Sequence, residues 1–190
     1  MTTTPSLAEF LATARREFAF LPKHLGFIEI EPGPNPYAVR YAKANVVVRI
    51  EGVNWGCVAN VLVTLDGVTL PLWAIAKAGG FCAAPAGDQL EQLSSLAQQL
   101  LKATELLDGD SSCMAAAQDI FQESASQLRA EERRAEEMEA DRRAIALSED
   151  AFRVGEWAKV VAALAPREAR LSRATAARLQ FARRKLRGEA

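Results

Sequence analysis

Residues 110–154 contain neither glycine nor proline. Because these two residues are the ones that a helix interior tolerates least, we expect one long helix here, capped by Ser111 or Ser112 and ending at about Val154. Its centre, RAEERRAEEMEADRR, is dominated by charge. Opposite charges lie three or four positions apart, as in Glu131 with Arg134 and Glu139 with Arg143, and such pairs stabilise an exposed helix by about 0.2–0.5 kcal/mol each.

The apolar residues of this helix form only a partial heptad pattern. Several are related by steps of seven or three, but polar and charged residues occupy other positions of the same seam. The apolar positions are Phe121, Leu128, Ala135 and Met138, and the interruptions are Ser124, Glu131 and Arg142. We therefore expect a solvated connector between two packed parts, with a long intermolecular coiled coil as the alternative.

The residues before this helix have the pattern of a small α+β domain. A first helix is expected from Thr4, as N-cap, through Leu21, with Pro22 and Gly26 closing it. Alternation of Val, Ile and Tyr with charged or small residues then predicts strands over 27–31, 37–42, 45–52 and 57–65 and a short one over 68–70. Their connections are too short for crossover helices, which favours an antiparallel meander.

Two further helices are expected before Gly109. One opens at Pro71, and the other opens with a capping box formed by Asp88 and Glu91. The fold class that follows is α+β. It divides into an α+β module (1–109), a mixed-charge helical connector (110–150) and a carboxy-terminal helical hairpin (151–190).

The hairpin is predicted from a change of pattern after the connector. The segment Gly155-Glu156-Trp157 turns the chain, and Pro166 ends the helix that follows. A third helix from about Ser172 is expected to bury Leu171, Ala174 or Thr175, Leu179, Ala182 and Leu186. The residues expected to anchor the packing are Trp157, Phe152 and Leu164 in the hairpin, and Phe18 and Tyr41 in the amino-terminal module.

The segment AFRVGEWAKVVAALAP (151–166) resembles the second half of one tetratricopeptide-type repeat. It has a small-aromatic pair, glycine and an aromatic at the turn, a cluster of small apolar residues and then proline. No second copy of this turn occurs upstream. The resemblance therefore implies a repeat-like hairpin, and it does not imply the concave peptide-binding groove that several repeats form.

The amino-terminal part resembles a group of small, mostly uncharacterised bacterial proteins whose members end in a similar helical hairpin. The residues that carry this resemblance are Phe18, Phe20, Leu21, Gly26, Phe27, Tyr37, Val39, Tyr41, Val46 and Val48. Some proteins of this group are suspected immunity factors for secreted toxins. The resemblance thus implies a binding role, and it brings no catalytic residue with it.

Charge is distributed unevenly along the chain. Residues 1–128 hold 8 basic and 13 acidic side chains, whereas residues 129–190 hold 15 and 11. Six arginines near the carboxy-terminal end are candidate contacts to a protein partner or to phosphates, namely Arg167, Arg170, Arg173, Arg183, Arg184 and Arg187. Nucleic-acid binding through them is the alternative to protein binding, and it would be strongly salt-dependent.

Little in the sequence favours catalysis or a cofactor. His24 is the only histidine, and the cysteines Cys57, Cys82 and Cys113 lack the spacing of a zinc site. The strand carboxylates Glu29, Glu31 and Glu51 alternate with apolar residues, so we expect them to face water. We predict no catalytic residue, no metal site and no cofactor.

No stretch approaches the roughly 18 apolar residues of a membrane span, and the first residues do not look like a secretion signal. We therefore expect a cytoplasmic chain without a membrane partner. The predicted function is non-catalytic binding of another protein, in its most concrete form the neutralisation of a cognate toxin. Nucleic-acid binding is the first alternative, and an enzyme of unknown class is the second.

Overall fold

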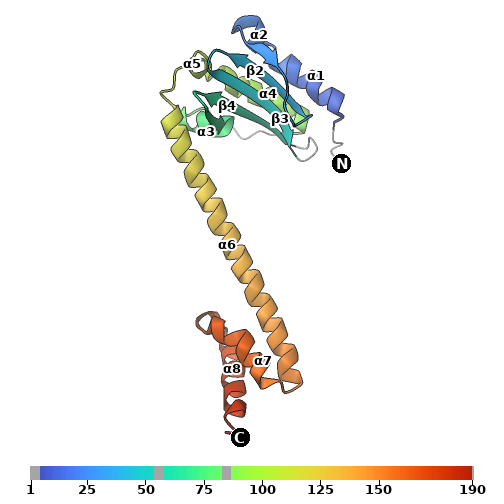
Figure 1. Ribbon diagram of the computed structural model, residues 1–190, viewed down its shortest axis with the longest axis vertical. Coiled ribbons are helices and arrows are strands. Elements are labelled where there is room, and N and C mark those ends of the chain that lie inside the picture. The colour runs from blue at the N-terminus through green and yellow to red at the C-terminus, as the bar shows by residue number, and fades with distance from the viewer. Residues whose placement is uncertain (1–4, 54–57, 83–86, 190) are drawn as a thin grey trace. The chain divides into compact units, whose positions relative to one another are not determined.

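The computed structural model describes residues 5–53, 58–82 and 87–189. The chain divides into two compact units, residues 1–125 (unit 1) and 126–190 (unit 2). The boundary lies within α6 (Met114–Arg153), a helix of 40 residues that confirms the prediction from the absence of glycine and proline (Figure 1). The α+β class is also confirmed.

Unit 1 is built on a five-stranded antiparallel sheet whose strands follow one another in chain order. The strands are β1 (Ile28–Ile30), β2 (Ala38–Lys43), β3 (Val46–Val53), β4 (Val58–Leu65) and β5 (Val68–Pro71). Between β4 and β5 the chain turns at Asp66 and Gly67, with φ of 50° and 80°. Two positive φ angles are what a two-residue type I′ turn requires. The predicted meander is therefore confirmed.

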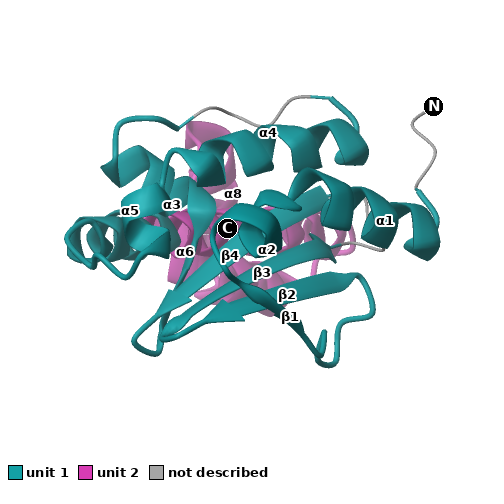
Figure 2. Ribbon diagram, turned by 90° about the horizontal axis from the view of Figure 1, so that it is seen from above, with its two compact units in different colours: residues 1–125 teal, residues 126–190 magenta. Residues whose placement is uncertain are grey.

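Helices α1 (Leu7–Glu17) and α4 (Gln89–Leu101) pack over one face of the sheet (Figure 2). The predicted anchors Phe18 and Tyr41 lie in the core beneath them, 0% and 2% exposed. In β2, β3 and β4, alternate residues point into the same core, as the strand period dictates. These inward positions include Val39, Val46, Val48, Ile50, Val61 and Val63. The opposite face of the sheet lies outside the helical layer.

The first helix differs from the prediction at both ends. Ser6 is its cap, because Ser6 Oγ accepts a hydrogen bond from Glu9 N–H at 3.3 Å and Glu9 Oε2 accepts one from Ser6 N–H at 2.9 Å. Thr4, the predicted cap, lies outside the described residues. The end of the predicted helix is a separate one, α2 (Phe20–His24). Pro22 sits at its third position, where no N–H donor is needed within the helix.

The described residues between β5 and Gly109 form three helices rather than the two expected. After α3 (Leu72–Ala78), the predicted capping box of Asp88 and Glu91 opens α4. That helix ends early, and Thr104 Oγ1 donates a hydrogen bond to the Leu101 carbonyl oxygen at 2.6 Å. Thr104 then begins a short separate helix, α5 (Thr104–Leu107). A side chain that satisfies a backbone carbonyl in this way competes with continuation of the helix.

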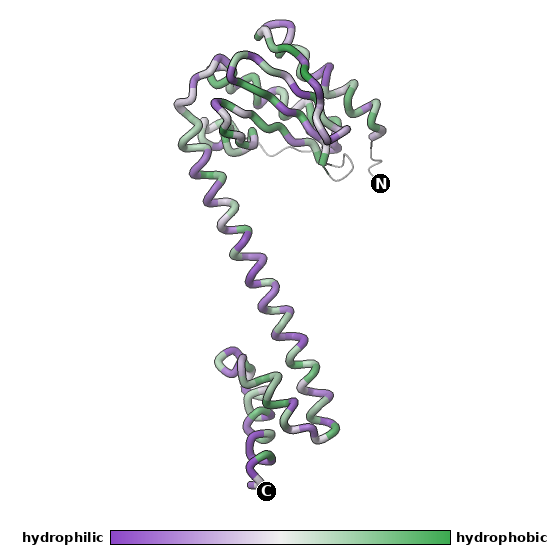
Figure 3. Tube along the Cα trace, viewed as in Figure 1, coloured by the Kyte–Doolittle hydropathy of each residue, from purple (hydrophilic) through white to green (hydrophobic). Residues whose placement is uncertain are grey.

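The middle of α6 is solvated. Residues 126–140 are exposed apart from the half-buried Ala130, and their hydrophilic character is visible in Figure 3. The predicted pair of Glu139 and Arg143 is present at 3.0 Å. Within the described ranges Glu131 and Arg134 form no ion pair. No helix in the described part of the chain is long and apolar enough to cross a membrane.

Unit 2 contains the end of α6 and the predicted hairpin. Its elements are α7 (Trp157–Leu164), the 3₁₀ helix η1 (Ala165–Arg170) and α8 (Arg173–Leu186). Gly155, with φ of 75°, forms the turn before α7, a conformation that a residue with a Cβ atom rarely adopts. Ser172 caps α8, since its Oγ accepts a hydrogen bond from Thr175 N–H at 3.3 Å.

Two glutamines at the start of α4 are expected to have opposite effects on stability. Gln89 is 4% exposed, and its amide has no hydrogen-bond partner among the described residues, whereas Gln92 Oε1 accepts a hydrogen bond from Ala59 N–H at 3.1 Å. Because an unpaired buried amide is costly, Gln89→Met should raise the free energy of unfolding by about 1–2 kcal/mol. Gln92→Met should lower it by about the same amount. Urea denaturation of both variants tests this, and equal effects at the two positions would contradict it.

Candidate functional site

Three aromatic rings hold the hairpin of unit 2 together. Trp157 lies edge-on against Phe152 with ring centroids 5.2 Å apart, and Phe181 from α8 lies 5.5 Å from each of them. Leu164, another predicted anchor, is fully buried beside this cluster. The sequence pattern did not single out Phe181. It directly precedes Ala182, which belongs to the predicted inner side of the helix.

The inner side of α8 is shorter than predicted. Leu179 and Ala182 are fully buried, but Leu186 is 52% exposed, so its predicted burial is wrong. At a rise of about 1.5 Å per residue, α7 is about 12 Å long and α8 about 21 Å. The last turn of α8 therefore extends past the helix that covers its start.

Two of the six candidate arginines bind carboxylates of α6. Arg167 Nε lies 3.0 Å from Asp141 Oδ1, and Arg170 bridges Glu137 and Asp141 at 3.2 Å each. Arg167 also donates a hydrogen bond to the Ala163 carbonyl oxygen at 3.2 Å. These contacts join residues about thirty positions apart in sequence, so they hold η1 against α6 within unit 2.

The other four candidate arginines divide into paired and unpaired ones. Arg183 forms a bidentate ion pair with Glu168, in which Nη1 donates to Oε1 at 2.7 Å and Nη2 donates to Oε2 at 2.8 Å. These hydrogen bonds lower the pKa of the Glu168 carboxyl. Arg187 lies 3.3 Å from Glu189. Over the described ranges, neither Arg173 nor Arg184 forms an ion pair. Most of the predicted basic surface is thus compensated inside the unit.

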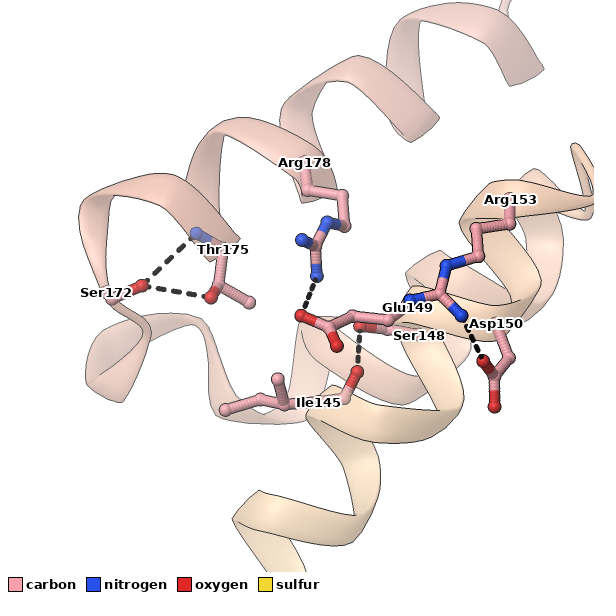
Figure 4. Close-up of polar contacts among 8 residues, drawn as sticks. All are labelled: Ile145, Ser148, Glu149, Asp150, Arg153, Ser172, Thr175 and Arg178. Carbon is pink, nitrogen blue, oxygen red and sulfur yellow. Dashed lines mark hydrogen bonds and ion pairs between the residues drawn. The ribbon is translucent and has the colours of Figure 1, made fainter.

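A polar contact between α6 and α8 is shown in Figure 4. Arg178 Nη1 donates a hydrogen bond to Glu149 Oε1 at 3.0 Å, and its guanidinium lies over the Phe152 ring at 5.7 Å. The fully buried Ser148 donates its hydroxyl to the Ile145 carbonyl oxygen at 2.7 Å. These side chains are occupied by the packing of the hairpin.

The outer face of the sheet, on the side away from α1 and α4, carries a row of uncharged side chains. The strand register places Ile28, Ala42, Val47, Thr64 and Thr69 beside one another from β1 to β5, and we call this set the uncharged row. Ile28 is 71% exposed, and Thr64 Oγ1 lies 2.8 Å from Thr69 Oγ1. With about 4.8 Å between neighbouring strands, the row is about 19 Å wide.

The adjacent row on the outer face contains two arginines side by side. It comprises Ile30, Arg40, Arg49, Leu62 and Pro71, and we call it the arginine row. Arg40 and Arg49 are direct cross-strand partners. This pair was not predicted from the sequence, although Arg40 and Arg49 are equally far from the two-residue turn that joins β2 to β3.

Glu29 is 41% exposed and so faces water as predicted, although from the helical side of the sheet, whereas Glu51 does not. Glu29 is opposite Tyr41 on the helical side of the sheet, where Arg15 Nη2 lies 2.8 Å from Glu29 Oε1. Its neighbours in β1 therefore point to the outer face. The Glu51 side chain is only 14% exposed and pairs with Arg49. Hydrophobic alternation alone did not reveal which side of the short β1 faces the helices.

No family model, curated protein or solved structure matches this chain. The resemblances to bacterial immunity factors and to a tetratricopeptide-type repeat therefore stay predictions.

One hollow in the described part of unit 1 is small. A pocket of about 220 Å³ lies where α3, α5 and the start of α6 meet, lined in part by Lys102, Glu105, Asp110 and Cys113. Burial, with the two nearby carboxylates, raises the pKa of the Cys113 thiol and keeps it protonated. Cys57 lies outside the described residues. Among those described, no group of three or more His, Cys, Asp or Glu residues could hold a metal ion.

Proposed function

We propose that this chain is a non-catalytic protein-binding protein and that the outer face of unit 1 is its binding surface. The observation that carries the proposal is the uncharged row. An exposed face of an antiparallel sheet normally presents polar residues to water. Here five neighbouring positions carry no charge, so a partner that covered them would remove apolar surface from water.

The hairpin arginines support this choice of surface by their own contacts. Arg167, Arg170, Arg183 and Arg187 already have carboxylate partners within unit 2. A partner would have to replace those contacts before gaining new ones. The outer face requires no such exchange along the uncharged row.

Photo-crosslinking in the native cell tests the proposal. With a photo-reactive amino acid in place of Thr64, we expect a discrete adduct between this chain and another protein. The substitution Val47→Glu should reduce that adduct by about tenfold or more, because it would place a charged side chain in the middle of the uncharged row.

Val68→Glu is the matched control. Val68 is 39% exposed and lies on the same sheet, but the register places it opposite the inward residue Leu65. The adduct should survive this change. Loss of the adduct in both variants, or in neither, would count against the outer face as the binding surface.

The narrower form of the proposal is a toxin-neutralising role, and it rests on the resemblance to immunity factors. It predicts a stable complex when this chain is co-expressed with the product of a neighbouring gene. Absence of any such complex would remove the immunity role and leave the broader proposal in place.

A further inference from the structure

Arg40 and Arg49 place two positive charges next to each other on the outer face. Residues directly opposite on neighbouring strands have Cβ atoms about 4.5–5.5 Å apart, and like charges in such positions repel. Arg40 Nη1 donates a hydrogen bond to the Glu31 carbonyl oxygen at 3.1 Å, which supplies no negative charge. Arg49 Nε lies 3.1 Å from Glu51 Oε2. Among the described residues, the Glu51 carboxylate thus contacts Arg49, and no carboxylate contacts Arg40.

The surroundings of this arginine pair are apolar except on one side, where Glu51 and Asn60 occupy the next row of the same face. Ile30 and Leu62 flank it within the arginine row, and Ala42 and Val47 of the uncharged row lie beside it. The Arg49 side chain is still 43% exposed. Guanidinium groups bind carboxylates through two parallel hydrogen bonds, and such bonds strengthen when a partner excludes water.

We infer that the outer face binds an acidic segment of its partner protein, with a carboxylate seated on Arg40 and Arg49 and apolar side chains on the uncharged row. The inference rests on the proposed function, which it makes more specific. Charge complementarity defines the occupant. A standard protein interface buries about 800 Å² on each partner. A face about 19 Å wide fits one extended segment or one helix better than a domain surface of that size.

Nuclear magnetic resonance of the isotope-labelled full chain tests this inference with polyglutamate as the probe. We expect polyglutamate to shift the Nε–Hε signals of Arg40 and Arg49 and the amide signals of β2, β3 and β4, and polylysine to shift neither. Arg40→Gln with Arg49→Gln should weaken polyglutamate binding by about tenfold or more, because each arginine loses a charge-assisted hydrogen bond. Both side chains point away from the core, so this variant should stay folded.

Arg173→Gln with Arg184→Gln is the matched control, since it removes two arginines without an ion pair in the described part of unit 2. This variant should bind polyglutamate as the wild-type chain does. If polyglutamate acts mainly through Arg173 and Arg184, or not at all, the inference is wrong. A thymidine oligonucleotide that binds Arg40 and Arg49 more tightly than polyglutamate would also overturn it, in favour of nucleic acid.

Different results would contradict the proposed binding surface and the inferred acidic ligand. If Val47→Glu abolishes the crosslinked adduct while the Arg40 and Arg49 substitutions leave it intact, the outer face binds a protein whose contact is not acidic. If neither change affects the adduct, the proposed function itself is wrong.

Discussion

Replacing Trp157 with alanine is expected to unfold the hairpin of unit 2 while the sheet of unit 1 stays folded. The indole contacts the rings of Phe152 and Phe181, and both contacts would be lost. Truncating a fully buried aromatic side chain costs about 3–5 kcal/mol, and because Trp157 is half-buried we expect the lower end of that range. A unit confined to residues 126–190 buries too little surface to absorb that loss.

Amide hydrogen exchange measures this effect element by element. Exchange in α7 and α8 should become about a hundredfold faster or more, whereas exchange in β2, β3 and β4 should stay unchanged. Binding at the outer face should persist, so that the substitution costs stability before it costs binding.

Leu186→Ala is the matched control for this experiment, because Leu186 lies on the same hairpin but is 52% exposed. It should change the free energy of unfolding by less than about 0.5 kcal/mol. A cost similar to that of Trp157→Ala would show that the last turn of α8 is packed after all.

The parts of the fold that the sequence predicted are those governed by local rules. Period-two alternation and short turns specified the meander, and the absence of helix breakers specified α6. The capping box at Asp88 likewise fixed the start of α4. Each of these signals lies within a few residues of the structure that it determines.

The parts that escaped prediction depend on contacts between distant residues. Arg167 and Asp141 are far apart in sequence, and only the path of the hairpin brings them together. In the same way, the register of β1 against β2 places Glu29 on the helical side of the sheet, beside Arg15 of α1. Spacing rules for helices describe neighbours three or four positions apart, so they are silent about such pairs.

The candidate binding site depends partly on local rules and partly on contacts between distant residues. The six hairpin arginines were visible in the sequence, but the long-range pairs of Arg167, Arg170 and Arg183 were not. The pairing of Arg40 with Arg49 could have been predicted, because a two-residue turn determines which residues oppose each other across a hairpin. What the sequence could not supply was the side of the sheet that the helices cover.

Tyr41 carries the second large prediction, since it is a large side chain of the unit 1 core that is 2% exposed. Tyr41→Ala should lower the free energy of unfolding by about 3–5 kcal/mol, a large share of the 5–15 kcal/mol typical of a domain. Tyr41→Phe keeps the ring and should cost about 1 kcal/mol or less near pH 7. Urea denaturation of both variants separates the ring from the hydroxyl.

The difference in stability between the wild-type chain and Tyr41→Phe is expected to change with pH. Burial raises the pKa of the Tyr41 phenol in the folded chain, and the Glu29 carboxylate adds to the effect. In the unfolded chain the phenol ionises near its usual pKa of about 10. Above that pH the unfolded state therefore binds fewer protons than the folded state, and the wild-type chain loses stability as pH rises.

Tyr41→Phe has no phenol at this position and lacks that loss. The stability of the variant relative to the wild-type chain should therefore rise between about pH 9 and pH 11. Other titrating groups are common to both proteins and cancel in the difference. A difference that stays constant over this range would mean that water reaches the hydroxyl in the folded chain and that α1 does not seal this part of the core.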